Sequence, residues 1–147
     1  LMAKLNAARG GQYPITVEFT FDVANDTMKN VSGTDDNFKA VGSHVFDAIL
    51  LPTNAIVVGG EVVTETAVSG STAYNVSVGD SVSATRYLGV TDRVAAGRSA
   101  LTLTGFVGGG EQVRVTVAPT VAEATAGKIT VRVSYIIRNR VTETQTH

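Results

Sequence analysis

Hydrophobic and polar residues alternate along three stretches of the chain. Residues 15–23 place an apolar side chain at every odd position and a polar one at every even position. Closely similar two-residue periods return over residues 112–117 and 129–138. Because successive side chains of a β-strand point to opposite faces, each stretch predicts a strand with one buried and one solvated face.

Four further runs are rich in the β-branched residues that favour strands, and clusters of Gly, Pro, Asn and Ser separate them. These runs are "HVFDAILLP", "AIVVGGEVVTETAV", "AYNVSVGD" and "SALTLTGFV". The Gly59-Gly60 pair inside the second run indicates a bulge, or a bend where a strand changes sheets. Only residues 25–40 and 90–96, and the opening residues, leave room for a helical turn.

The pattern as a whole predicts an all-β protein, a jelly-roll-type β-sandwich of about eight antiparallel strands with an extended N-terminal arm. A chain of 147 residues is of the size of one domain. We divide it into an arm over residues 1–12, a sandwich domain over 13–138 and a polar tail over 139–147. The arm is mildly basic, and its apolar Leu1, Met2 and Leu5 require burial somewhere.

Composition narrows the function classes. Twelve basic and thirteen acidic side chains leave a net charge of -1, and aromatic residues make up 6% of the chain, without tryptophan. Nucleic acid and anionic membranes attract strongly basic surfaces, and single strands stack on aromatic rings, so we expect neither partner. The chain has no cysteine, which suits synthesis in a reducing cytoplasm, and no apolar run of about 20 residues that would span a bilayer. We expect no cofactor.

Residues 77–103 place four charged side chains at six-residue intervals: Asp80, Arg86, Asp92 and Arg98. Such a set offers three interpretations, namely a binding site for an anion or sugar, mutual ion pairs, or structural bonds within a long connection. Asp in a "VGD" sequence commonly closes a turn through its own backbone. We therefore interpret these residues as a structural clasp that holds a loop to the body of the domain.

Candidates for catalysis are few. His44 begins a predicted strand and His147 is the last residue, so neither has the neighbours that a nucleophilic triad or a metal site requires. Glu61 and Glu65 offer a carboxylate pair, but two residues four apart on a strand share its solvated face. Four aspartates offer oxygen ligands for calcium: Asp22, Asp26, Asp35 and Asp36. Their spacing does not match that of an EF-hand loop. We expect no metal site and no enzyme.

An ordered set of motifs resembles a known group of proteins. The motifs are "LPTNAIVVGGEVVTETAV", "YNVSVGD", "ATRYLGVTDRVAAGRSALTLTG" and "ATAGKITVRVSYIIRNR". They resemble small structural proteins of tailed bacteriophages, in particular the head decoration or cement proteins of podovirus-like and siphovirus-like phages, and the resemblance covers about residues 45–138. It implies a jelly-roll β-sandwich on the outside of the shell, added once the capsid has expanded, and no catalytic residues.

The resulting hypothesis is a virion protein, made in the bacterial host cytoplasm, that cements the outer surface of a capsid. Its partners would be the major capsid protein and other copies of itself, as a dimer or trimer. The expected contact residues are Lys4, Leu5, Arg9, Arg138 and Arg140. Two alternatives stay open: a tail or fibre component that uses the same sandwich for attachment, and a glycan-binding or hydrolytic β-sandwich.

Overall fold

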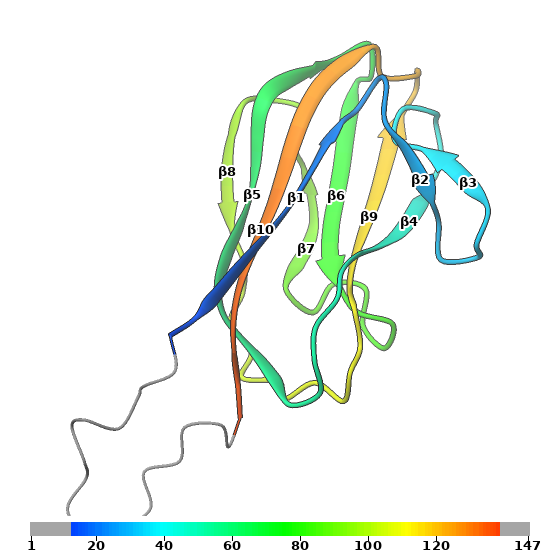
Figure 1. The fold of residues 1–147 in the computed structure, drawn as a ribbon. Coiled ribbons are helices and arrows are strands. Elements are labelled where there is room, and N and C mark those ends of the chain that lie inside the picture. Colours follow the sequence, from blue (N-terminus) through cyan, green and yellow to red (C-terminus); the bar gives the residue numbers. More distant parts are fainter. Residues whose placement is uncertain (1–12, 139–147) are drawn as a thin grey trace, which may run out of the picture.

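The computed structural model describes residues 13–138, and this part of the chain forms ten β-strands and no helix (Figure 1). The strands are β1 (Ile15–Asp22), β2 (Thr27–Lys29), β3 (Asp35–Asn37), β4 (His44–Ile49), β5 (Ala55–Ser69), β6 (Ala73–Gly79), β7 (Leu88–Asp92), β8 (Gly97–Ala100), β9 (Val113–Thr120) and β10 (Ala126–Ile137). The helical turns for which the sequence left room over residues 25–40 and 90–96 do not form. β2 and β3 occupy the first of these stretches, and β7 extends into the second.

Eight of the strands form two four-stranded antiparallel sheets, in the orders β1-β10-β5-β8 and β4-β9-β6-β7. The chain passes from one sheet to the other at each connection between these eight strands except β6 to β7. Two facing sheets joined in this way form a jelly roll. The predicted fold class is confirmed, and the hairpin of β2 and β3 is an addition to it, inserted between β1 and β4.

The inward-facing side chains of both sheets form one core, which the alternation of the sequence had indicated. Completely buried valines come from both sheets and include Val62, Val76, Val115 and Val131. Phenylalanines fill the side of the sandwich on which β1 and β4 lie. The ring of Phe38, which follows β3, stacks on Phe21 with centroids 4.2 Å apart and lies 4.3 Å from Phe46. The inserted hairpin therefore leads one aromatic side chain into the core.

The glycine pair in β5 marks a break in register, but the strand does not change sheets. The pairing of β5 with β10 shifts between Ser134 and Tyr135, opposite Gly59 and Val57. A Cβ atom on Gly60 would lie 2.3 Å from the carbonyl oxygen of Arg132, and φ there is 144°. The expected bulge is present. The alternative of a sheet change is wrong, because β5 pairs with β10 along its length.

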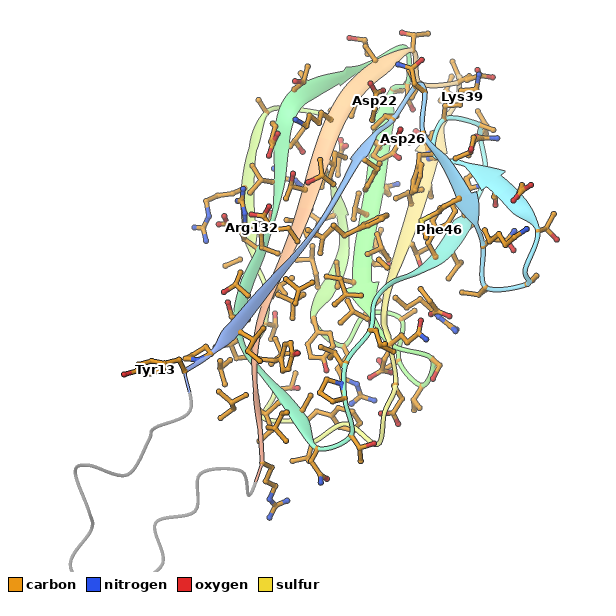
Figure 2. All side chains as sticks on the ribbon, viewed as in Figure 1. Tyr13, Asp22, Asp26, Lys39, Phe46 and Arg132 are labelled. Atoms are coloured by element: carbon orange, nitrogen blue, oxygen red, sulfur yellow. The ribbon has the colours of Figure 1, made fainter. Side chains whose placement is uncertain are left out.

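The sandwich has two ends with different surroundings (Figures 1 and 2). We call "loop end" the end formed by loops 50–54, 80–87 and 101–112. The first described residue, Tyr13, lies at this end, and the backbone N–H of Arg138, the last, donates to the carbonyl of Asn54 at 2.8 Å. Asp22, Asp26 and Lys39 lie at the opposite end. Both termini of the described domain thus leave from the loop end.

Candidate interaction surfaces

Asp80 organises the connection between β6 and β7. Its side chain is 3% exposed, and one carboxylate oxygen accepts hydrogen bonds from the backbone N–H groups of Val82 and Ser83 at 2.9 and 2.8 Å. The other oxygen accepts from Nε of Arg86 at 2.5 Å. Burial raises the pKa of Asp80, but the bonds from Arg86 and the two N–H groups outweigh it and hold the pKa below its usual value. The carboxylate is therefore ionised and fully engaged within its own turn.

Two further contacts fix this turn. The guanidinium carbon of Arg86 lies 3.6 Å from the centroid of the Phe106 ring, which belongs to another loop of the same end. A Cβ atom on Gly79 would lie 2.1 Å from the carbonyl oxygen of Ser83, so the turn closes on a backbone that only glycine permits. The turn is consequently tied both to itself and to its neighbour.

The six-residue spacing does not gather all four charged residues. Asp92 lies at the end of β7, where one of its oxygens accepts from the backbone N–H groups of Tyr74 and Val94, both at 3.0 Å. Arg98 lies on β8 and bonds to Glu61 of β5. The structure brings Asp80 and Arg86 together, and it gives Asp92 and Arg98 separate partners.

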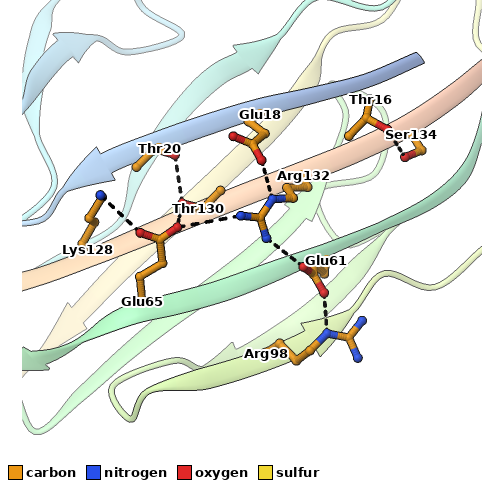
Figure 3. A network of polar contacts seen from close by, with 10 residues as sticks. All are labelled: Thr16, Glu18, Thr20, Glu61, Glu65, Arg98, Lys128, Thr130, Arg132 and Ser134. Atoms are coloured by element: carbon orange, nitrogen blue, oxygen red, sulfur yellow. Dashed lines mark hydrogen bonds and ion pairs between the residues drawn. The ribbon is translucent and has the colours of Figure 1, made fainter. Parts of the chain in front are cut away.

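Charged side chains form a continuous network across the outer face of the sheet β1-β10-β5-β8, which we call the polar face (Figure 3). Arg132 of β10 is its centre: Nε donates to Glu18 of β1 at 2.5 Å, and Nη1 donates to Glu61 of β5 at 2.8 Å. Arg98 of β8 donates to the second oxygen of Glu61. One chain of ion pairs thus crosses all four strands.

A second part of the polar face surrounds Glu65. Its carboxylate accepts from the hydroxyl of Thr130 at 2.8 Å and lies 3.2 Å from Nζ of Lys128. These two contacts lower the pKa of Glu65, and hydrogen bonds from Arg98 and Arg132 lower the pKa of Glu61. A glycosidase pair requires one carboxyl group whose pKa is raised so that it can act as an acid. The pKa values of Glu61 and Glu65 are both lowered instead, so neither residue fits the role of this acid.

His44 and the aspartates considered as calcium ligands make local structural contacts. The Nδ1 and Nε2 atoms of His44 lie 2.8 Å from a carboxylate oxygen of Asp36 and from the carbonyl oxygen of Ala40, respectively. Asp22 accepts from the backbone N–H of Ala24, and Asp35 pairs with Lys29 at the surface. Within residues 13–138, no group of three or more His, Asp or Glu side chains could hold a metal ion. His147 lies outside the described residues.

A shallow, open pocket of about 290 Å³ lies beside the β1–β2 turn at the opposite end. Its polar lining includes Asp22, Asn25 and Lys128. Both carboxylate oxygens of Asp22 already accept hydrogen bonds from its own turn, and those bonds lower its pKa. The lining offers no unengaged acid or base for chemistry on a ligand.

A buried arginine that the sequence did not single out joins β5 to the connection between β7 and β8. Arg93 is 8% exposed, and its Nη1 donates to the hydroxyl of Ser99 at 2.6 Å. Its carbonyl oxygen accepts from the Thr64 hydroxyl at 2.7 Å. Its Nε has no hydrogen-bond partner among the described residues. An arginine next to a valine in a loop gives no sequence signal of such burial.

The expected partner contacts fall mostly outside the described residues. This holds for Lys4, Leu5, Arg9 and Arg140. Arg138 is exposed at the loop end, where the chain leaves the last strand. In the described part of the chain, no helix has the length and apolar character of a membrane span.

Comparisons with known proteins support the fold. No family model and no curated protein matches the chain. Its structure is similar to a chain from the capsid asymmetric unit of cyanophage Pam1, with a TM-score of 0.56 and 23% sequence identity. The similarity covers 92% of this chain and 94% of the phage chain. At this identity the likeness shows a shared β-sandwich fold along nearly the whole length of both chains.

Proposed function

We propose that this protein is a structural component of a bacteriophage capsid, which binds the outer surface of the shell and cements neighbouring subunits of the major capsid protein. The observation that carries the proposal is the similarity over 92% of the chain to a chain of a phage capsid asymmetric unit. The motif resemblance to phage decoration proteins supports the same role. No catalytic step belongs to this proposal.

The physical case for cementing lies in the rigidity of the domain and in repetition. A sandwich whose two sheets share one core transmits force between the surfaces that it touches. Packed DNA pushes the shell outward, so a rigid domain bound to two neighbouring subunits adds interface that must break before the shell opens. Repetition around the shell multiplies a modest contact into a large collective stabilisation.

We assign the shell contact to the arm and to the basic residues that flank the domain. Lys4 and Arg9 supply charge and Leu5 supplies apolar surface on the arm, while Arg138 and Arg140 follow the last strand. The arm precedes Tyr13 and the tail follows Arg138, and both of these residues lie at the loop end of the sandwich. One docking event could therefore use both.

The test is co-sedimentation with expanded shells that lack this protein. The full chain should pellet with them to saturation and should raise the temperature at which the shells open. A chain without residues 1–12 should bind at least tenfold more weakly. Two matched variants separate the contributions of the arm: a Lys4→Gln and Arg9→Gln pair removes charge, and Leu5→Ser removes apolar surface. Failure of the full chain to pellet would overturn the proposal and favour a tail or fibre component.

A further inference from the structure

Each loop of the loop end exposes one large apolar side chain. Leu50 is 73% exposed in the β4–β5 loop, Val82 is 73% exposed in the β6–β7 loop, and Leu103 is 55% exposed in the β8–β9 loop. Tyr13, at the start of the described chain, is 85% exposed at the same end. Single exposed apolar residues are common on protein surfaces, but a gathering of them at one end marks an interaction site.

The exposed residues of these loops carry no charge. Loops 50–54, 80–87 and 101–112 contain three charged residues, of which Asp80 is buried and Arg86 and Glu111 are half-buried. Asp80 and Arg86 pair with each other, and a carboxylate oxygen of Glu111 accepts from the backbone N–H of Gly109 at 2.6 Å. The other exposed side chains on these loops are mainly Ser, Thr and Ala, and Arg138 stands at the rim.

The loops also hold one another in place. The backbone N–H of Asn54 donates to the carbonyl of Gly108 at 2.7 Å, which joins the first loop to the third. The N–H of Thr102 donates to the carbonyl of Tyr87 at 2.7 Å, which joins the third loop to the second. A surface that is already ordered loses little conformational entropy when it binds. The Asp80 turn in particular holds Val82 outward on a fixed backbone.

Two other surfaces of the domain carry exposed charge. The opposite end exposes Asp26, Glu123 and Lys128, and the polar face carries its network of ion pairs. Two copies that met through such surfaces would have to align opposite charges and strip water from them. Two copies that meet through the three loops bring no exposed loop charges together and bury Leu50, Val82 and Leu103, while Arg138 stays at the rim of the contact.

We propose that the loop end is the surface through which copies of this chain bind one another, with the occupant of this surface being the loop end of a second copy. In a symmetric contact the same surface of both copies meets, so any exposed charge would face a like charge. The three loops expose no charge and therefore avoid this repulsion. Tyr13 and Arg138 also lie at this end, so association brings the first and last described residues of the copies toward one another. The proposal does not depend on the function of the protein in a capsid.

Sedimentation equilibrium of the full chain tests this proposal, with three variants at the loop end: Leu50→Lys, Val82→Lys and Leu103→Lys. Each adds a like charge to both sides of the contact and should weaken self-association at least tenfold. Val41→Lys is the matched control, because Val41 is 55% exposed and lies at the opposite end. Its neighbour Gly42 donates its backbone N–H to the carbonyl oxygen of Pro119, near the end of β9. Far-ultraviolet circular dichroism establishes that each variant is folded.

A second measurement uses the absence of cysteine from the chain. Val82→Cys and Leu103→Cys each introduce a single thiol at the loop end, and spin labels on them should report short distances between copies. A label at Val41→Cys should not. A wild-type chain that stays monomeric at millimolar concentration, or loop-end lysine variants that associate like the wild type, would overturn the proposal. Loss of association only when residues 1–12 are removed would assign the contact to the arm instead.

Discussion

At the scale of single residues, Asp80 shows how one buried carboxylate fixes a whole connection. It accepts two backbone N–H groups and an arginine Nε, which are the donors that the turn would otherwise leave unpaired. The sequence marks this residue through "VGD", and the close approach of Ser83 to Gly79 explains why glycine precedes it. The turn is therefore an ordered platform for Val82, with its charge neutralised internally.

Asp80→Asn should lower the free energy of unfolding by about 1–3 kcal/mol at neutral pH, because the charge-assisted bond to Arg86 is lost. The pKa of Asp80 is lower in the folded chain than in the unfolded one. Its contribution is therefore present above about pH 4, the ordinary pKa of an aspartate, and falls away as the pH drops through the folded-state value. Urea unfolding between pH 7 and pH 2 measures this.

The control for this prediction is Asp35→Asn, which removes an ion pair with Lys29 at the surface. Exposed pairs contribute little, so its unfolding curve should match that of the wild type at each pH. If Asp80→Asn left the free energy of unfolding as unchanged as Asp35→Asn does, the Asp80 turn would not stabilise the fold.

Val121 is a strained residue in the turn between β9 and β10. Its φ is 70° and its side chain is 81% exposed, so burial does not repay the left-handed backbone conformation that a β-branched side chain disfavours. Val121→Asn should raise the free energy of unfolding by about 1 kcal/mol, because asparagine tolerates this conformation. Thermal unfolding measures the change, and Val41→Asn should leave stability unchanged. A lower melting temperature for Val121→Asn would contradict this account.

At the scale of elements, the polar face links four strands through charges that are distant in sequence. Glu18 and Arg132 are separated by 114 positions, and Glu61 and Arg132 by 71. Register places them side by side, since Glu18 and Glu61 both stand opposite Arg132 in the β1–β10 and β10–β5 pairings. Cross-strand pairs of opposite charge favour this register over neighbouring ones.

Removing the arginines of the polar face should move the pKa of Glu61 back toward its ordinary value. The hydrogen bond from Arg98 lowers that pKa most, so Arg98→Gln should raise it more than Arg132→Gln does. The pKa of Glu65 depends first on Thr130 and Lys128, so Arg98→Gln should leave it unchanged. Carboxyl carbon chemical shifts followed through a pH titration distinguish the two residues. Equal shifts at both would mean that the network acts only as a diffuse field.

Beside the register break, the close approach of β5 to β10 requires a residue without a side chain, Gly60. Gly60→Ala would place its Cβ against the backbone carbonyl of Arg132 at a positive φ, and backbone cannot move aside as a flexible side chain can. We expect a loss of at least about 1 kcal/mol in the free energy of unfolding. Gly89→Ala on β7 is the control, because a Cβ there meets nothing within 4 Å. Comparable urea midpoints for the two variants would contradict the close approach.

The sequence predicted the strands whose own residues alternate between apolar and polar side chains. β1, β9 and β10 follow from strict alternation, because the sheet solvates one face of each. The strands β2 and β3 were missed, since three residues are too few to show a periodic pattern. Phe38, which follows β3, stacks on Phe21 of β1, and this contact is not visible in the local sequence. Sequence likewise marked Asp80 as a turn residue. It did not reveal the partners of Arg132 or the exposure of Val82, because these depend on pairings between distant segments.

At the scale of the whole molecule, the jelly roll separates an end with exposed charges from an end whose three loops expose none. Crossing between sheets at nearly every connection brings the loops after β4, β6 and β8 to the same end, together with the start of β1 and the end of β10. Sequence distance between these loops is large, so only the topology gathers Leu50, Val82 and Leu103. The same topology leaves Tyr13 and Arg138, the first and last described residues, at that end.

The domain over residues 13–138 should fold without the segments that flank it. The core cluster among the described residues contains side chains from both sheets, and it is closed by Phe21, Phe38 and Phe46 within the domain itself. A chain of residues 13–138 should therefore unfold cooperatively, with a free energy within about 0.5 kcal/mol of the full chain at micromolar concentration. At higher concentration both chains should gain stability through association by mass action, because both contain the three loops of the loop end. Urea unfolding of both chains at two protein concentrations separates these effects. A truncated chain that is unfolded at both concentrations would show that residues 1–12 or 139–147 are required for folding. A stability that does not depend on protein concentration would count against association through the loop end.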